Sequence, residues 1–360
     1  MSNSSTVEIH LDADFLQSLP ADPTPIFKQL AWKHLFQKLS YHATLPEARA
    51  LIPQLQHVVE QVHLVASDYR DLRIQTTKNL LNFISYPQEI ASGETLSFSH
   101  YPAIVCGSGP SLENSFPVLQ ALQGKALIIG CGSSLPKLLR AGIIPTFAAC
   151  IDPNPEIDPL FAEAKVPLLF QERVGQKLFQ TLPGPKVYMG SSSAFPLDHY
   201  LLKAAGIKPF FLDAGWGAAT FGAACAKQWG CLQIAICGVD GAEQLDRVHS
   251  RKWMENIALT PLDQITPRAL PPFAVKKIKR QSPEKQMAHL RQEIMRLDAL
   301  KSEPRPIFEA ELSTSLLSEL IFDPIWLIYK HLFLREKGEI GTHQFFFYQR
   351  LLNAYKEVLC

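Results

Sequence analysis

A chain of 360 residues is long enough for one large α/β domain with helical additions, or for two domains. Apolar residues make up 47% of it and its net charge at pH 7 is +1, which predicts a soluble globular protein without general attraction to nucleic acid or to membranes. The sequence has no run of about 18 uncharged apolar residues and no basic, apolar leader, so neither a membrane span nor a secretory signal is predicted.

The cysteines have the pattern of core residues. Cys106, Cys150 and Cys237 each end an apolar, strand-like run, and the sequence contains no Cys-x-x-Cys motif. This usage is typical of a reducing compartment and predicts neither a disulfide framework nor a zinc site. We therefore expect a cytoplasmic protein.

Residues 1–94 are predicted to form an N-terminal helical region. Residues 1–24 are polar and interrupted by prolines, so a loose or edge segment is expected there. From residue 24 to residue 84 the pattern is helical, with an apolar stripe spaced by three and four residues: Leu51, Leu55, Val58, Val62, Val65, Tyr69 and Leu72. Residues 87–100 are expected to be a linker.

Residues 95–275 are predicted to form the central domain, in which short strands alternate with helices. Strands are expected at 102–106, 125–130, 146–151, 166–170, 186–189, 208–212 and 232–237, and helices at 111–123, 133–141, 157–164, 174–181, 195–205 and 217–229. This alternation favours parallel pairing through right-handed crossovers. The fold class expected is therefore α/β: a Rossmann-like, doubly wound, mostly parallel sheet with helical additions at both ends.

Residues 276–360 are predicted to form a C-terminal helical region, with helices at 284–300, 307–320, 323–335 and 339–357. Its aromatic run from Phe345 to Tyr348 predicts a packing surface or a homo-oligomer interface. The region opens on a basic cluster, for which a solvated face is the simpler interpretation and the flank of an anionic substrate site the alternative: Lys276, Lys277, Lys279 and Arg280.

The stretch from 102 to 115 has the pattern of an anion site. An apolar run ends at Cys106, Gly107-Ser108-Gly109 follows, and Pro110-Ser111 opens a helix. Backbone N–H groups and the helix dipole favour negative charge at such a turn, and glycine lets a phosphate approach the backbone. A tight turn without a ligand is the alternative.

Small and polar residues follow most of the other predicted strands too. Because the carboxyl ends of parallel strands share one edge of a sheet, these turns should lie together, and we expect a phosphate-bearing ligand there. The candidate nucleotide-binding residues are Gly107, Ser108, Gly109, Pro110, Ser111, Gly132, Ser133, Asp152, Asn154, Gly215, Trp216 and Gly217.

Two common nucleotide-binding motifs do not fit. The dinucleotide fingerprint requires a third glycine where Leu112 stands, and a carboxylate after the second strand, where the sequence has Gly130-Cys131-Gly132. A Gly-Lys-Ser/Thr motif, as in a P-loop, does not occur in the sequence. NAD and P-loop chemistry are therefore not expected.

The motifs resemble those of the MptE-like domain. The resemblance covers roughly residues 95–260 and rests on the Val105–Leu112 run, Ala141-Gly-Ile-Ile-Pro145 leading to Asp152, the 213–220 run and Ile236-Cys-Gly-Val-Asp240. That family contains archaeal 6-hydroxymethylpterin diphosphokinases and bacterial motility accessory factors, the latter similar to sialyltransferases and implicated in glycosylating flagellin with nonulosonic acids. The histidine following the last aspartate, His249 after Asp240, resembles the motility accessory factors.

The resemblance implies a nucleotide-dependent transferase. The first hypothesis is a glycosyltransferase using a CMP-nonulosonate type of donor, with Asp240 and His249 as catalytic residues at the acceptor side; a surface loop histidine is the alternative for His249. The second is diphosphate transfer from ATP to a pterin, with Mg²⁺ as cofactor on Asp152 and Asp240. The third is a nucleotide-binding protein without catalysis. The acceptor, a protein hydroxyl or a small molecule, is not identified by the sequence.

Overall fold

The computed structural model describes residues 6–34, 38–86, 90–192, 198, 202–203, 205–207, 210–240, 257–272, 276–278 and 281–300. The chain forms two compact units, residues 1–74, 194–204 and 289–360 in the first and residues 75–193 and 205–288 in the second. The long helix α3 (Pro46–Ser85) contributes residues to both. In the described part of the chain, no helix is long and apolar enough to cross a membrane.

The first unit combines helices with a small parallel sheet. Strands β1 (Thr6–His10) and β2 (Lys38–His42) pair in parallel from Thr6↔Lys38 to His10↔His42. Helix α1 (Ala13–Ser18) follows β1 and is capped by the Asp12 carboxylate, which accepts a hydrogen bond from the Phe15 N–H at 2.8 Å. The chain continues through α2 (Thr24–Lys33).

The structure refines two predictions for this region. The segment expected at residues 1–24 to be loose or an edge contains β1, which is an edge strand of a two-stranded sheet, and α1. The helical pattern expected from residue 24 to residue 84 is interrupted by β2. In the stripe on α3, Leu55, Val58, Val62 and Val65 are buried and Leu51 is half-buried.

The second unit is built on an eight-stranded sheet among the described residues, in the order β10-β3-β8-β7-β6-β5-β4-β9. All neighbours pair in parallel except β10 with β3. The strands are β3 (Ile90–Ser92), β4 (Pro102–Cys106), β5 (Leu127–Cys131), β6 (Phe147–Cys150), β7 (Leu168–Phe170), β8 (Lys186–Tyr188), β9 (Gln233–Cys237) and β10 (Lys276–Lys277). The predicted doubly wound, mostly parallel α/β fold is confirmed.

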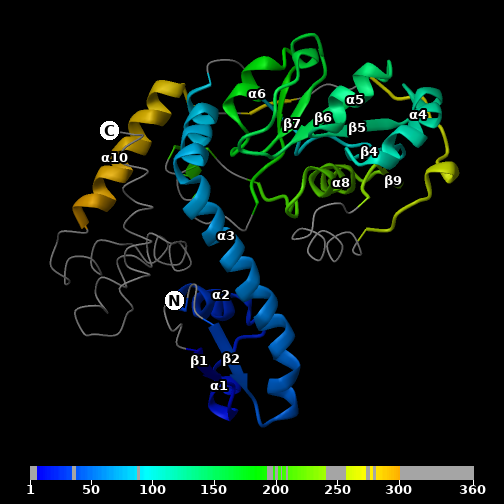
Figure 1. The fold of residues 1–360 in the computed structure, drawn as a ribbon. Helices are drawn as coiled ribbons and strands as arrows, with labels where there is room; N and C mark the ends of the chain where they lie inside the picture. The colour runs from blue at the N-terminus through cyan, green and yellow to red at the C-terminus, as the bar shows by residue number, and fades with distance from the viewer. Residues whose placement is uncertain are drawn as a thin grey trace. The chain divides into compact units, whose positions relative to one another are not determined.

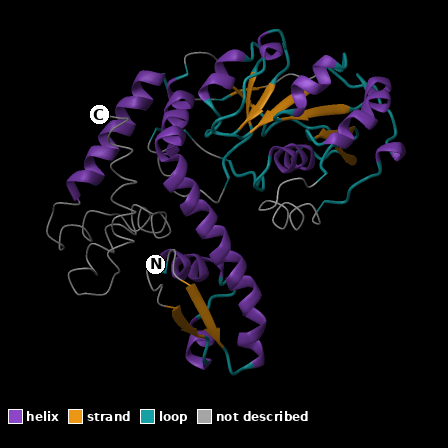
Figure 2. Ribbon diagram, in the orientation of Figure 1, coloured by secondary structure: helices purple, strands orange, loops and turns teal. Residues whose placement is uncertain are grey.

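Helices cover both faces of this sheet (Figures 1 and 2). On one face, Ile104 and Cys106 of β4 pack with Leu119 of α4 (Phe116–Leu122) and Leu138 of α5 (Ser134–Arg140). On the other, the alternate β4 residues Ala103 and Val105 pack with Phe221 of α8 (Ala218–Gln228). This two-sided burial explains why β4 is an unbroken apolar run.

Short elements complete the second unit: the 3₁₀ helices η1 (Pro110–Ser115), η2 (Pro159–Ala162) and η3 (Leu262–Gln264), with α6 (Gln176–Thr181) and α10 (Pro283–Leu300), which begins here. β3 lies within the segment expected to be a linker. Of the strand expected at 208–212, the described residues 210–212 contain one isolated bridge, Ser191↔Phe211.

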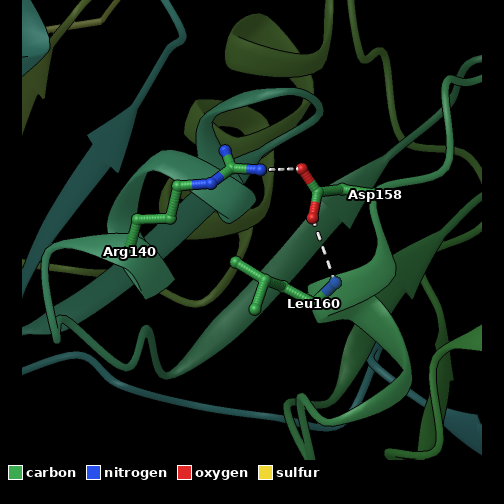
Figure 3. Close-up of polar contacts among 3 residues, drawn as sticks. All are labelled: Arg140, Asp158 and Leu160. Atoms are coloured by element: carbon green, nitrogen blue, oxygen red, sulfur yellow. Dashed lines mark hydrogen bonds and ion pairs between the residues drawn. The ribbon is translucent and has the colours of Figure 1, made fainter.

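The segment between β6 and β7 is fastened to α5 by an ion pair (Figure 3). Arg140 at the end of α5 contacts the Asp158 carboxylate, whose other oxygen accepts a hydrogen bond from the Leu160 N–H at 3.0 Å and thereby caps η2. The Leu160 N–H, followed by the Arg140 guanidinium, holds the pKa of Asp158 below its usual range.

Lys186, at the amino end of β8, makes the stability of the fold depend on pH. Its side chain is buried, and its ammonium group donates hydrogen bonds to the backbone oxygens of Leu182 and of Gly184, the latter at 2.9 Å. Burial lowers the Lys186 pKa from 10.5 to about 8. Between these two values the unfolded chain binds more protons than the folded one, so this residue makes stability rise as the pH rises.

We therefore expect the stability difference between wild type and Lys186→Met to change between pH 8 and pH 10 in favour of the wild type. Urea unfolding of both proteins at the two pH values measures it, and the buried thiols, which also titrate there, cancel in the comparison. A difference independent of pH would mean that Lys186 keeps an ordinary pKa.

Candidate functional site

The candidate site lies where the order of the sheet reverses. From β4 the chain adds β5, β6, β7 and β8 in sequence on one side, and then returns to place β9 on the other side of β4. In doubly wound sheets, ligands bind at such a switch point, beyond the carboxyl ends of the strands. Here the two strands end at Cys106 and Cys237, which are partners in the β4–β9 register.

The turns that follow β4 and β9 interlock through glycine. The Gly107 N–H donates to the Cys237 oxygen at 2.8 Å, and the Gly109 N–H donates to the Gly238 oxygen at 2.7 Å. A Cβ atom on Gly107 would overlap the Gly238 oxygen, and one on Gly109 would overlap the Asp240 carboxylate. Glycine is therefore needed at 107 and 109 because two backbones approach closely.

Asp240 is bound by the turn that follows β4. One carboxylate oxygen accepts a hydrogen bond from the Ser111 N–H at 2.8 Å, and the other accepts one from the Ser111 hydroxyl. These hydrogen bonds, the hydroxyl's first and then the N–H's, lower the Asp240 pKa, and the positive charge of Lys137 lowers it further. Asp240 is thus an ionised residue that holds the two turns together, and it is a weak base.

Lys137 is a cation of this edge that the sequence did not single out. It extends from α5, half-buried, and its ammonium group donates to the Ser108 oxygen at 2.6 Å. In the turn itself, the N–H groups of Gly107, Gly109 and Ser111 donate within the protein and Pro110 has none. Among the described residues of the turn, this leaves the Ser108 N–H as a backbone donor with no hydrogen bond inside the protein, beside the positive charge of Lys137.

Below the turn, the side chains of Cys106 and Cys237 are buried in the core. The sulfur atoms of Cys106 and Cys237 are 3.6 Å apart. The hydrogen bond with Cys237, together with burial, raises the pKa of Cys106 well above its usual range, so that Cys106 stays a neutral thiol. The Ser134 hydroxyl, on α5, donates to the Cys106 oxygen at 2.7 Å and fixes the start of α5 against the end of β4.

The turn after β5 lies next to the start of α8. Gly132, with φ of +53°, donates its N–H to the Ala149 oxygen at 2.8 Å, and a Cβ on it would lie 3.6 Å from the Ala218 Cβ. The first N–H groups of α8, including that of Ala218, have no acceptor inside the helix and carry the positive end of its dipole. The structure thus brings Gly132 and Ser133 close to this helix start.

The 213–217 turn leads into α8. The Gly215 N–H donates to the Asp213 carboxylate at 3.1 Å, and the Gly217 N–H donates to the Thr220 hydroxyl at 3.1 Å, which in turn donates to the Gly217 oxygen at 2.7 Å. Gly215 has φ of +60°, where a side chain would be strained and would crowd Thr220. The turn, which also contains Trp216, therefore positions the helix start.

Asp152 and Asn154 lie further along the same edge. Both are exposed in the turn after β6, where the Asp152 carboxylate accepts a hydrogen bond from the Asn154 N–H at 2.8 Å. β6 and β9 are three places apart in the sheet, a separation of about 14 Å. Asp152 and Asp240 thus follow strands that are not neighbours, although Asp240 reaches the turn after β4. Among the described residues, no group of three or more carboxylate, histidine or cysteine side chains could hold a metal.

A buried polar group follows β7 and was missed. Glu172 accepts a hydrogen bond from the Ser191 hydroxyl at 2.9 Å, and the Tyr188 and Ser191 hydroxyls are 2.7 Å apart. Burial, followed by the charge of Glu172, raises the pKa of Tyr188 well above its usual range. The signal in the sequence is the charged pair Glu172-Arg173 directly after an apolar strand.

Several residues lie outside the described ones: His249, Lys279, Arg280 and the helices expected at 307–320, 323–335 and 339–357. The proposed role of His249 therefore stays a prediction.

Comparisons with known proteins agree with the fold. Residues 75–246 match the family described as 6-hydroxymethylpterin diphosphokinase MptE-like. A solved structure of a Maf glycosyltransferase from Magnetospirillum magneticum AMB-1 superposes with a TM-score of 0.54 at 14% identity, over 94% of this chain and 67% of that one, and shows a shared fold. No curated protein matches the chain. The resemblance indicated by the sequence motifs is confirmed, because residues 75–246 match the MptE-like family.

Proposed function

We propose that the protein is a nucleotide-dependent glycosyltransferase whose donor is a sugar activated by a nucleoside monophosphate, of the CMP-nonulosonate type. The observation that carries the proposal is that Ser111 and Asp240 are hydrogen-bonded to each other, beside Lys137, at the switch point of the sheet. Support also comes from the fold shared with a Maf glycosyltransferase and from the family match.

The hydrogen-bond donors and the positive charge at the turn after β4 suit one phosphate group. The N–H groups of Gly107, Gly109 and Ser111 are used within the protein, and Lys137 contributes one positive charge. A lysine, one turn N–H and the start of α8 match a single phosphate, such as that of CMP. A triphosphate would place far more negative charge against the exposed Asp152 and Asp240 carboxylates.

In the proposed reaction, the bond between the sugar's anomeric carbon and the phosphate oxygen breaks, and negative charge develops on the leaving phosphate. Lys137 and the dipole of α8 stabilise that charge. An acceptor hydroxyl forms the new bond to the anomeric carbon and passes its proton to His249 as general base. Asp240, with its lowered pKa, orients the turn rather than taking the proton.

The description of the matching family supports a second candidate, diphosphate transfer from ATP to 6-hydroxymethylpterin. That reaction requires Mg²⁺, and the described residues contain no group of three or more carboxylate, histidine or cysteine side chains that could hold the ion.

An assay with and without EDTA distinguishes the candidates. We expect transfer from a CMP-activated nonulosonate, measured as CMP release in the presence of an acceptor mixture, to be unchanged by EDTA. ATP-dependent diphosphorylation of the pterin that collapses with EDTA would establish the second candidate instead. Nucleotide binding without either turnover would mean a binding protein, and absence of nucleotide binding would contradict all three.

A further inference from the structure

Asn79, near the end of α3, contacts two turns that are distant from it in the sequence. Its side chain is 1% exposed, and its amide nitrogen donates to the Pro153 oxygen at 2.8 Å and to the Arg173 oxygen at 2.9 Å. Its amide oxygen accepts hydrogen bonds from the Gln176 N–H at 3.2 Å and from the Gln75 side chain at 3.0 Å. Both donors and both acceptor positions of the amide are therefore used.

These contacts join the turn after β6 to the turn after β7. Pro153 belongs to the first turn, Arg173 belongs to the second, and Gln176 begins α6 directly after it. The turns also contact each other directly, because the Gly175 N–H donates to the Asp152 oxygen at 2.9 Å and a Cβ on Gly175 would overlap the Pro155 ring. A single buried amide thus fixes the backbone next to Asp152 and the turn that contacts it.

The turn after β6 presents an exposed carboxylate, Asp152, and an exposed amide, Asn154, to the carboxyl edge. β6 is two places from β4, so these side chains are about 10 Å from the proposed phosphate position. A nucleoside spans that distance from its own phosphate. In dinucleotide-binding sheets a carboxylate at this edge accepts hydrogen bonds from ribose hydroxyls, there after the second strand rather than the third.

We propose that Asn79 is the positioning residue for the nucleoside half of the donor: it holds the turn that carries Asp152 and Asn154, and these bind the ribose and base. The proposal rests on the proposed function, and it assigns the phosphate and the nucleoside to separate parts of one edge. Lys137 and Ser108 hold the phosphate, and the β6 turn, locked by Asn79, holds the nucleoside.

The test compares two probes, CMP and inorganic phosphate, by calorimetry and by competition. Asn79→Ala should weaken CMP binding about tenfold or more and change the affinity for inorganic phosphate less than about twofold. Gln75→Ala, which removes a partner of Asn79 on α3 without contacting either turn, should leave both affinities unchanged. Lys186→Met controls for lost stability, because it also removes two hydrogen bonds to buried backbone oxygens.

Asp152→Asn keeps the proposal testable if Asn79→Ala does not fold, since Asp152 is exposed. This variant should also weaken CMP binding about tenfold or more and change the affinity for inorganic phosphate less than about twofold. If wild type binds CMP but the folded Asn79 variant loses no more affinity than Lys186→Met, or if Asp152→Asn binds CMP normally, the positioning role is overturned and the proposed function stands. If wild type does not bind CMP, both are overturned.

Discussion

Gly109→Val should lower the affinity for CMP tenfold or more, about 1.4 kcal/mol. Gly109 has φ of −63°, which suits any residue, so the cost comes from crowding alone. A side chain there would overlap the Asp240 carboxylate and lie 2.8 Å from the Gly238 oxygen, so that Asp240 must leave Ser111. Calorimetric titration with CMP measures the loss.

Gly142→Ala is the matched control for this prediction. Gly142 has φ of +71° and nothing within 4 Å of a Cβ, so the variant costs about 1–2 kcal/mol of stability through backbone strain alone. It should bind CMP as wild type does. Unchanged CMP binding by folded Gly109→Val would mean that the turn is only a connection between strand and helix.

His249→Ala should lower kcat about a hundredfold or more and leave the affinity for the donor nearly intact. A general base contributes about 10²–10⁴ to the rate, and it acts on the acceptor's proton, not on the binding of the nucleotide. Steady-state kinetics with the CMP-activated sugar, together with CMP titration, separates the two quantities.

His100→Ala serves as the control, because His100 is an exposed histidine that follows none of the predicted strands of the sheet. It should keep the wild-type kcat. If His249→Ala also turns over at the wild-type rate, the proton goes elsewhere and His249 is an ordinary surface residue.

The strands that the sequence predicts well are those with a local signal. β4 and β9 are apolar runs buried in the sheet, so their identity does not depend on a partner. β2 and β3 were missed for the opposite reason. β3 has three residues and is a strand because it pairs with β8, and β2 alternates over too few residues to stand out beside two helices.

The residues of the candidate site also differ in whether they have a local signal in the sequence. Gly107 to Ser111 and Asp240 could be found because each follows a strand and has a type of residue with a local chemical role. Lys137 and Asn79 could not, because they contact backbone oxygens 29 and 74 residues away, and helix patterning cannot distinguish them from surface residues. Only the tertiary fold gives them a role.

A crystal structure with bound CMP is the most direct test of the central claim, that a nucleotide's phosphate binds at the switch point of the sheet. We expect the phosphate within hydrogen-bond distance of the Lys137 ammonium, between the turn at Ser108 and the start of α8, with the ribose toward Asp152. CMP bound at the amino ends of the strands, or outside the second unit, would contradict it.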